Sequence, residues 1–237
     1  TLLAQVDSSI GGKTGINNRF GKNLIGTFFQ PDLVISDINI LNSLPKREII
    51  CGYAEIFKHS LIKDKKNFNF LNKNKFKIFN LEKKLLKKAI AESCKIKKFI
   101  VQKDEKENNF RKVLNLGHTF AHAYEATLNY SKRLNHGEAV LLGIKSAAKF
   151  SLVNKKLSKN TYYKIIDHLN RLNINYNLKN YLKPNKINKI IKFMKSDKKN
   201  RNKNINLILL KGIGKPIINL TFDQKRIYSF LKKELMN

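Results

Sequence analysis

Three of the five histidines in this chain of 237 residues lie in one short stretch, Arg111–Val140. His118 and His122 are four residues apart, so on a helix both imidazoles would lie on one face. His136 follows a loop-like break and directly precedes a second helical pattern, Glu138–Phe150. Two imidazoles from neighbouring helices, together with one carboxylate, can bind zinc and leave one coordination position open for a substrate. The spacing therefore indicates a catalytic metal site.

Glu55, in the segment CGYAEIFKHS, is the upstream candidate for the carboxylate. Ordinary core or helix-end histidines are the alternative interpretation, and an isolated pair of histidines would favour it. However, Arg111, Asn115 and Gly117 are expected on the same helix as the pair, and polar groups on a face that should be buried usually mark a site. For Glu55, the alternative is a surface ion pair with Lys58, worth only about a few tenths of a kcal/mol.

The elements that must position these residues are mostly helices. Periodic apolar residues predict helices over 47–62, 81–101, 138–153, 161–172 and 184–194, and a final helix with a capping signature at Thr221 and Gln224. The segment 64–80 is a connector or a weak helix. Ile205–Leu210 predicts a strand, and Asp32–Asp37 (DLVISD) predicts a short buried strand. Residues 1–45 are richer in glycine than the rest of the chain.

Lysines dominate the charge of the chain. There are 48 Lys and Arg against 17 Asp and Glu, a formal net charge of +31. The lysines are spread along the whole chain among Asn and Ile, which indicates a global bias and no dedicated nucleic-acid patch. Their positive field would attract anionic small molecules. Lys97 is an exception, because it falls on the apolar stripe with Leu86, Ile90 and Cys94, where it either extends to solvent or points into a cavity.

Two short signals lie near the start of the chain. Gly11–Gly15 is a flexible loop that contains Lys13, and backbone amides in such loops approach phosphates closely. Taken alone it is a weak signal, because the spacing of a P-loop is absent. Asp7 is equally well explained as a helix cap or as a ligand to hydroxyls.

Cys51 and Cys94 are isolated, which indicates free thiols in a reducing, cytoplasmic compartment. No apolar run approaches the roughly 20 residues of a membrane helix. The chain begins without an initiating Met, so we expect a fragment or a processed piece.

Six segments resemble the 3-dehydroquinate synthase family in the order that the family has them. They are LLAQVDSSIGGKTGIN, GKNLIG, GYAEIFKH, LNLGHTFAHAYEA, HGEAV and SDKKN. The resemblance covers at least residues 1–214 and corresponds to the C-terminal two-thirds of the family, without its N-terminal NAD-binding part. Six ordered motifs are far more specific than any one of them.

The resemblance implies an α+β fold, mainly α. Residues 1–45 would be a remnant of an N-terminal α/β NAD-binding domain, and residues 46–237 a helical metal- and substrate-binding domain. It places Glu55, His118 and His136 on zinc or cobalt, and His122 facing the substrate. Other residues would lie around the substrate: Asp7, Asn23, Lys58, Lys97, Arg111, Asn115 and either Lys198 or Lys199. NAD would be contacted by Lys13, Lys22 and the segment Ile40, Leu41, Asn42 and Ser43.

The implied reaction converts 3-deoxy-D-arabino-heptulosonate 7-phosphate to 3-dehydroquinate and phosphate, in the shikimate pathway to aromatic amino acids. The metal would make a substrate hydroxyl easier to deprotonate, and NAD would take a hydride and later return it. Phosphate elimination, ring opening and an aldol closure would follow. The protein would mainly position groups and stabilise charge. The family is commonly dimeric, so a homodimer is expected.

Other interpretations stay open. Another sugar phosphate cyclase or a polyol dehydrogenase would share the helical architecture, although the anion-binding residues favour a phosphate-bearing substrate. A non-catalytic basic protein that binds nucleic acid would show steeply salt-dependent binding without zinc.

Overall fold

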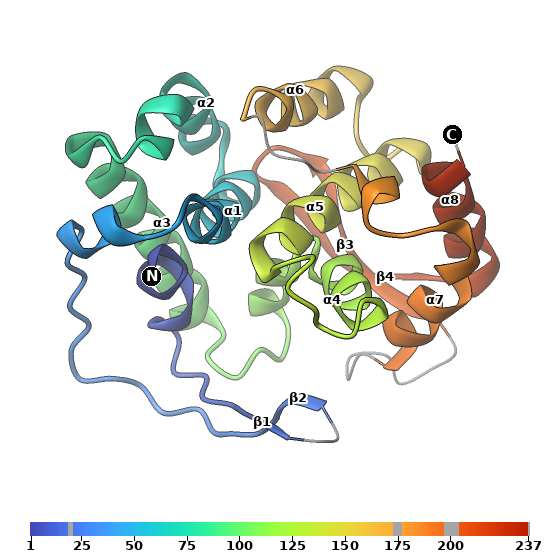
Figure 1. Cartoon of the computed structure of the whole chain (residues 1–237), viewed down its shortest axis with the longest axis horizontal. Helices are drawn as coiled ribbons and strands as arrows, with labels where there is room; N and C mark the ends of the chain where they lie inside the picture. Colours follow the sequence, from blue (N-terminus) through green and yellow to red (C-terminus); the bar gives the residue numbers. More distant parts are fainter. Residues whose placement is uncertain (19–20, 173–176, 197–203, 237) are drawn as a thin grey trace.

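Two helices, α1 (Lys46–Lys63) and α5 (His136–Val153), run through the middle of a mainly helical fold (Figure 1). The computed structural model describes residues 1–18, 21–172, 177–196 and 204–236. On one side, α2 (Lys65–Phe79) and α3 (Lys83–Lys103) pack on α1 and on each other. The other side holds the remaining helices: α4 (His118–Thr127), α6 (Lys159–Asn170), α7 (Ile187–Ser196) and α8 (Gln224–Met236).

The central helix α1 is buried on all sides. It begins after Pro45, and every residue from Cys51 to Ile62 is buried. A helix with no solvent face is normally apolar all round, but α1 carries Glu55, Lys58 and His59 in this enclosed part. Buried charges must be paired or bind a ligand. The polar groups of α1 therefore identify the region where function is to be sought.

The N-terminus of α5 is held firmly against α1. Asn135 and Glu138 form a capping box that satisfies the free amides of its first turn. Glu138 also receives two hydrogen bonds from Arg47 of α1, from Nε at 2.7 Å and from Nη2 at 2.6 Å. A two-pronged contact between a guanidinium and a carboxylate fixes direction as well as distance. Consequently, His136, the first residue of α5, has a defined place relative to α1.

A β-hairpin packs on α5 through its first strand and on the C-terminal part of α1 through its second strand and its turn. It consists of β3 (Ile205–Gly212) and β4 (Lys215–Phe222), which pair antiparallel around a turn with Gly214 at φ 76°. Alternate residues of β3, namely Ile205, Leu207 and Leu209, are buried. The predicted strand at 205–210 is confirmed, whereas β4 is not predicted from the sequence.

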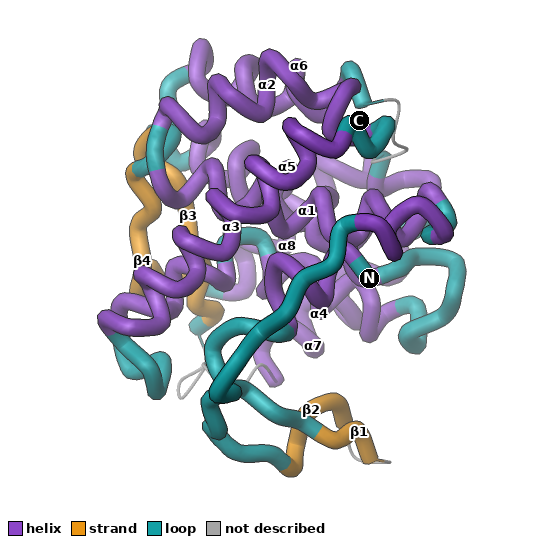
Figure 2. The backbone as a smooth tube through the Cα atoms, turned by 90° about the vertical axis from the view of Figure 1, so that its left-hand side faces the viewer, coloured by secondary structure: helices purple, strands orange, loops and turns teal. Residues whose placement is uncertain are grey.

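The N-terminal segment is built differently. A short π-helix, Ala4–Ser8, packs on α1 and α3, and a small hairpin of β1 (Ile16–Asn18) and β2 (Gly21–Ile25) projects away from the helices (Figure 2). A 3-10 turn at Asn39–Ser43 then leads into α1. The buried strand predicted at 32–37 is wrong, because this segment is an exposed loop. A strand requires a neighbour for its backbone hydrogen bonds, and the described residues provide none there.

Other details also differ from the predictions. Residues 65–79 form a full helix, whose N-terminus is capped by Asp64. The cap of α8 is Asp223, which accepts from the amide of Arg226 over 2.8 Å, whereas Thr221 lies in β4. Arg111 and Asn115 lie on a separate 3-10 turn, Phe110–Asn115, and not on the histidine helix. Two further 3-10 turns are Leu178–Asn180 and Pro184–Lys186.

In the described part of the chain, no helix is both long enough and apolar enough to span a membrane. Both cysteines are free thiols.

Candidate metal centre

Three potential metal ligands converge where α1, α4 and α5 meet. Glu55 lies in the middle of α1, and His118 and His136 are the first residues of α4 and α5. Their donor atoms all lie within 4.8 Å of one another, and Nε2 of His118 is 3.5 Å from Oε1 of Glu55. One carboxylate and two imidazoles suit zinc and leave one coordination position open. The fold therefore brings together the trio expected from the sequence.

Both imidazoles are oriented through Nδ1. In His118 this nitrogen donates to the carbonyl of Leu116 over 3.3 Å, and in His136 it donates to the carboxylate of Glu125 over 3.2 Å. Metal-binding histidines ordinarily donate their other ring N–H to a carbonyl or a carboxylate, which fixes the tautomer. Each ring is thereby left with Nε2 for a metal ion, so the residues present fit zinc or cobalt.

Sequence reasoning misses Glu125, although a signal for it exists. It follows His118 by seven residues and His122 by three, which places all three on one face of α4. The side chain is 6% exposed, and a carboxylate is rarely buried to that extent without a partner.

The carboxylate of Glu55 is fully buried and forms an ion pair with the ammonium of Lys58. The alternative of a surface pair is therefore wrong. Within the described residues, neither oxygen of Glu55 accepts a hydrogen bond of ordinary geometry. Burial raises the pKa of Glu55, and the charge of Lys58 opposes that rise. A buried carboxylate with unused lone pairs is the expected state of a metal ligand before it binds its ion.

The two imidazoles differ in their titration. Burial, reinforced by the charge of Lys58, holds the pKa of His118 well below its ordinary value, so the ring is neutral near pH 7. Burial also lowers the pKa of His136, but the hydrogen bond to Glu125 and the charges of Glu125 and Glu55 together outweigh it and raise that pKa above the ordinary value. A histidine must be neutral to bind a metal ion. His118 is therefore ready at neutral pH, and His136 becomes so once its proton is released.

Two other groups of residues could hold a cation. One consists of His122, Glu125 and His136, and the other of Asp7, Glu55 and His59. In the first, Glu125 is already engaged by Nδ1 of His136. In the second, Asp7 already meets the ammonium of Lys97, and Nδ1 of His59 is 2.6 Å from Oγ of Ser93. The trio of Glu55, His118 and His136 is therefore the best-suited group.

His122 lies one turn beyond His118 and is exposed. Its ring centroid is 5.3 Å from that of His118 and 6.2 Å from that of His136. An exposed imidazole beside a metal centre can reach a bound substrate, as the resemblance implies.

Buried cations lie next to the metal ligands. Nζ of Lys97 donates to Asp7, to its Oδ1 over 2.6 Å and to its carbonyl over 2.5 Å. Lys58 and Arg111 are each only 2% exposed. Burial alone would raise the pKa of Asp7, but Lys58 and Lys97 outweigh it and hold that pKa well below its ordinary value. Lys97 therefore points into the protein and does not extend to solvent, and the buried cations outnumber their carboxylate partners.

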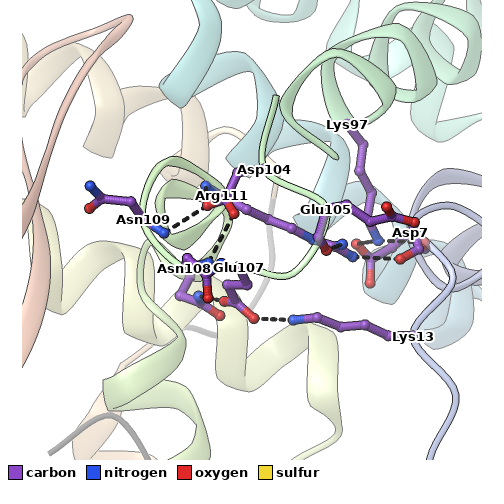
Figure 3. Close-up of polar contacts among 11 residues, drawn as sticks. Asp7, Lys13, Lys97, Asp104, Glu105, Glu107, Asn108, Asn109 and Arg111 are labelled. Atoms are coloured by element: carbon purple, nitrogen blue, oxygen red, sulfur yellow. Dashed lines mark hydrogen bonds and ion pairs between the residues drawn. The ribbon is translucent and has the colours of Figure 1, made fainter. Parts of the chain in front are cut away.

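The loop before the histidine helix holds Arg111 in place (Figure 3). Asp104 accepts hydrogen bonds from the amides of Asn108, Asn109 and Arg111 over 2.8–2.9 Å. The guanidinium of Arg111 donates to the carbonyl of Glu105 and, over 2.8 Å, to that of Gly11. Burial lowers the pKa of Arg111. Its hydrogen bonds therefore go to carbonyl oxygens, while nearby carboxylates, that of Glu107 most strongly, stabilise its charge.

Glu107 joins two of the expected site residues. Its carboxylate contacts the ammonium of Lys13 (Figure 3). It also accepts a hydrogen bond from the side-chain amide of Asn115. Sequence reasoning treats this segment as a plain turn and misses Glu107. A signal was present, since three acidic residues between 104 and 107 are unusual in a chain with 17 acids and 48 basic residues.

His59 is a further residue that sequence reasoning misses. It is fully buried, its Nδ1 is 2.6 Å from Oγ of Ser93, and burial holds its pKa well below the ordinary value. Because it lies one turn after Glu55 on α1, the i, i+4 spacing could have indicated that it borders the same site.

The residues expected at NAD do not converge. Lys13 lies beside Glu107, and Lys22 is on β2 with Asn23, in a hairpin that stands apart from the helices. Within the segment 40–43, Leu41 is fully buried and therefore serves packing, whereas Ile40, Asn42 and Ser43 are exposed. Lys198 and Lys199 lie outside the described residues.

Family models match most of the chain. The model described as 3-dehydroquinate synthase N-terminal matches residues 1–51, and that described as 3-dehydroquinate synthase C-terminal matches residues 52–200. The 3-dehydroquinate synthase of Pelagibacter ubique (strain HTCC1062) is 60% identical over 99% of this chain, which corresponds to 64% of that protein. The chain thus spans slightly less than two-thirds of the length of this curated relative.

Two solved structures share the fold. The first is 2-epi-5-epi-valiolone synthase from Streptomyces hygroscopicus subsp. jinggangensis 5008 with NAD+ and Zn2+ bound, with a TM-score of 0.87 and 24% identity. The second is 2-deoxy-scyllo-inosose synthase complexed with carbaglucose-6-phosphate, NAD+ and Co2+, with a TM-score of 0.83 and 25% identity. They are matched over 99% and 98% of this chain, and over 64% and 65% of their own lengths.

Proposed function

The chain belongs to the 3-dehydroquinate synthase family, and from that premise we propose that it provides the metal- and substrate-binding part of a 3-dehydroquinate synthase. The reaction would convert 3-deoxy-D-arabino-heptulosonate 7-phosphate to 3-dehydroquinate and phosphate. The single observation that carries the proposal is the convergence of Glu55, His118 and His136 beside a set of buried cations.

Zinc or cobalt at this trio would supply Lewis-acid chemistry, making a neighbouring substrate hydroxyl easier to deprotonate. The chain's own residues would bind and orient the substrate. Lys58, Lys97 and Arg111 are held in fixed positions by carboxylates and carbonyls. An incoming carboxylate or phosphate would replace these partners and bring stronger, charge-assisted hydrogen bonds.

The remaining site residues would act on the substrate hydroxyls and protons. Asp7 lies near Glu55 as an ionised carboxylate, and His122 lies near His118 and His136 as an exposed imidazole. Asn115 is held by Glu107 and offers an amide. By family resemblance we also assign Asn23 and one of Lys198 and Lys199 to the substrate.

NAD would supply a reversible hydride transfer. By family resemblance we assign Lys13, Lys22 and the segment 40–43 to NAD. The described residues place these groups on separate segments. We therefore assign them contacts with NAD and no chemical step.

The two solved structures point to related substrates as the second candidate. Their names describe synthases of other products, and the second is complexed with carbaglucose-6-phosphate, so a different sugar phosphate is the alternative substrate. The 60% identity to a 3-dehydroquinate synthase favours the heptulosonate phosphate. We further propose a homodimer in the cytoplasm, which the family resemblance and the two free thiols support.

A phosphate-release assay tests the proposal. The chain should be assayed with the heptulosonate phosphate, NAD and zinc, both alone and joined to the nucleotide-binding part of the Pelagibacter relative. We expect release by the joined protein, and its loss in the joined Glu55→Ala variant. No release by either form would reject the assignment.

A further inference from the structure

The three metal ligands come from three helices, so the geometry of the site depends on how closely those helices cross. α5 meets both of the others. Glycine inside a helix is less stable than alanine, but α5 has glycine at 137 and at 143. Each of them lies at a crossing where another backbone approaches α5 very closely.

The first crossing joins α5 to α1. A Cβ atom added to Gly137 would lie 2.2 Å from Cα of Cys51. The amide of Gly137 also donates to Sγ of Cys51 over 3.2 Å. Cys51 is one helical turn before Glu55, and Gly137 directly follows His136. This contact therefore sets the separation between the carboxylate ligand and one imidazole.

The second crossing joins α5 to α4. A Cβ atom added to Gly143 would lie 2.2 Å from the carbonyl oxygen of Gly117 and 3.0 Å from the amide nitrogen of Ala121. Gly117 has φ 80° and directly precedes His118. This contact sets the position of the second imidazole relative to α5. The obstructing atoms in both crossings are backbone atoms, which cannot rotate out of the way as the end of a side chain can.

We propose that Gly137 and Gly143 are positioning residues for the metal centre, which act by letting α1 and α4 approach α5 closely enough for their ligands to meet one ion. The inference rests on the proposed metal site. An alanine at either position would push the neighbouring backbone away by roughly 1 Å to reach an ordinary contact distance. Metal–ligand distances tolerate only about 0.2 Å, so such a shift is several times too large.

The experiment measures zinc binding to the full chain by competition with a chelator, for wild type, Gly137→Ala, Gly143→Ala and Gly212→Ala. Gly212→Ala is the matched control, because its added Cβ would meet only Cδ of Lys215 at 3.9 Å. We expect about tenfold weaker binding or more for the two α5 variants, the range seen when support of a metal site is lost. Gly212→Ala should bind zinc as wild type does. In the α5 variants the visible spectrum of bound Co2+ should change, because it reports coordination geometry.

Thermal unfolding separates positioning from a general loss of stability. At a fixed zinc concentration, bound zinc raises the unfolding temperature by an amount that grows with the logarithm of its affinity, so the zinc-induced rise is compared for each variant with its own metal-free value. Positioning predicts a smaller rise in the α5 variants. A lower metal-free temperature with an unchanged rise and an unchanged Co2+ spectrum would overturn the inference. A wild-type chain that binds no zinc would overturn the proposed metal site and this inference with it.

Discussion

The junction of α1, α4 and α5 and the segment 10–40 are built on opposite principles. At the junction, backbones touch through glycines and even the charged side chains are buried. In the segment 10–40, apolar side chains lie in solvent: Phe29 is 77% exposed, Leu33 75% and Ile35 83%. Exposed apolar side chains in this number usually mark a surface that another part of a protein covers.

The difference teaches which half of the site this chain can organise by itself. Residues expected at the metal are brought together by packing, whereas those expected at NAD lie on separate segments: Lys13 beside Glu107, Lys22 on β2, and residues 40–43 in the 3-10 turn before α1. This supports the proposal that residues 1–45 belong to an α/β nucleotide-binding domain and that residues 46–237 form the metal- and substrate-binding domain.

The strongest test of the contrast is the same substitution in each region. Leu141 of α5 is fully buried, so Leu141→Ala should lower the free energy of unfolding by about 3 kcal/mol. Leu33→Ala should change it by less than about 0.5 kcal/mol. Urea unfolding measures both. A loss of similar size at Leu33 would show that the segment contributes to the core and that the contrast is wrong.

The second test removes a metal ligand. His118→Ala should weaken zinc binding by more than about 100-fold, because a ligand matters more than the residues that support it. His122→Ala is the matched control, since His122 is on the same helix but exposed and outside the trio. Calorimetric titration with zinc measures both. A large loss in His122→Ala with little loss in His118→Ala would instead place the ion in the group formed by His122, Glu125 and His136 and would contradict the trio.

The third test asks whether the buried charges need one another. Lys97→Met leaves the carboxylate of Asp7 with one cation fewer, so the free energy of unfolding should fall by about 2 kcal/mol. Lys98→Met, at the exposed neighbouring position, should change it by less than about 0.5 kcal/mol. Chemical unfolding at pH 7 distinguishes them. Equal effects would mean that the Lys97 pair is no more than a surface pair.

The fourth test probes a buried histidine away from the metal. His168 is held between the hydroxyl of Tyr53 at 2.9 Å and Oδ1 of Asn72 at 3.1 Å, and burial lowers its pKa from 6.5 to about 3. Below pH 6.5 the unfolded chain therefore takes up a proton that the folded chain refuses, and stability falls as the pH falls towards 3.

The expected loss from this residue between pH 7 and pH 5.5 is about 1.3 kcal/mol. In the His168→Gln variant that part of the pH dependence should vanish, although its stability at pH 7 will also be lower. Unfolding free energies at the two pH values give the comparison. An identical pH slope in both proteins would contradict the assignment of His168 as a neutral core residue.

Sequence reasoning reached the metal trio because its signals are local. The spacing of His118 and His122 predicts one face of a helix, which the structure confirms. The position of Lys97 on an apolar stripe leaves two outcomes open, extension to solvent or burial, and the structure shows burial. Glu125 and Glu107 carry local signals that do not reveal their roles, because those roles depend on His136 and Lys13, which the fold brings in from other segments.

The wrong predictions of secondary structure have the same origin. The sequence DLVISD has the composition of a strand, but a strand forms only where a neighbour offers backbone partners. Conversely, β4 contains Pro216 and few clear signals, yet it pairs along β3 because the turn at Gly214 brings it there. Local composition states what a segment can become, and long-range pairing decides whether it does.

The most direct measurement is the X-ray absorption spectrum of the chain loaded with one equivalent of zinc. The account predicts two imidazole nitrogens and carboxylate or water oxygens at about 2.0–2.2 Å, and no sulfur. A sulfur ligand at about 2.3 Å, or a zinc ion surrounded only by oxygen, would contradict it.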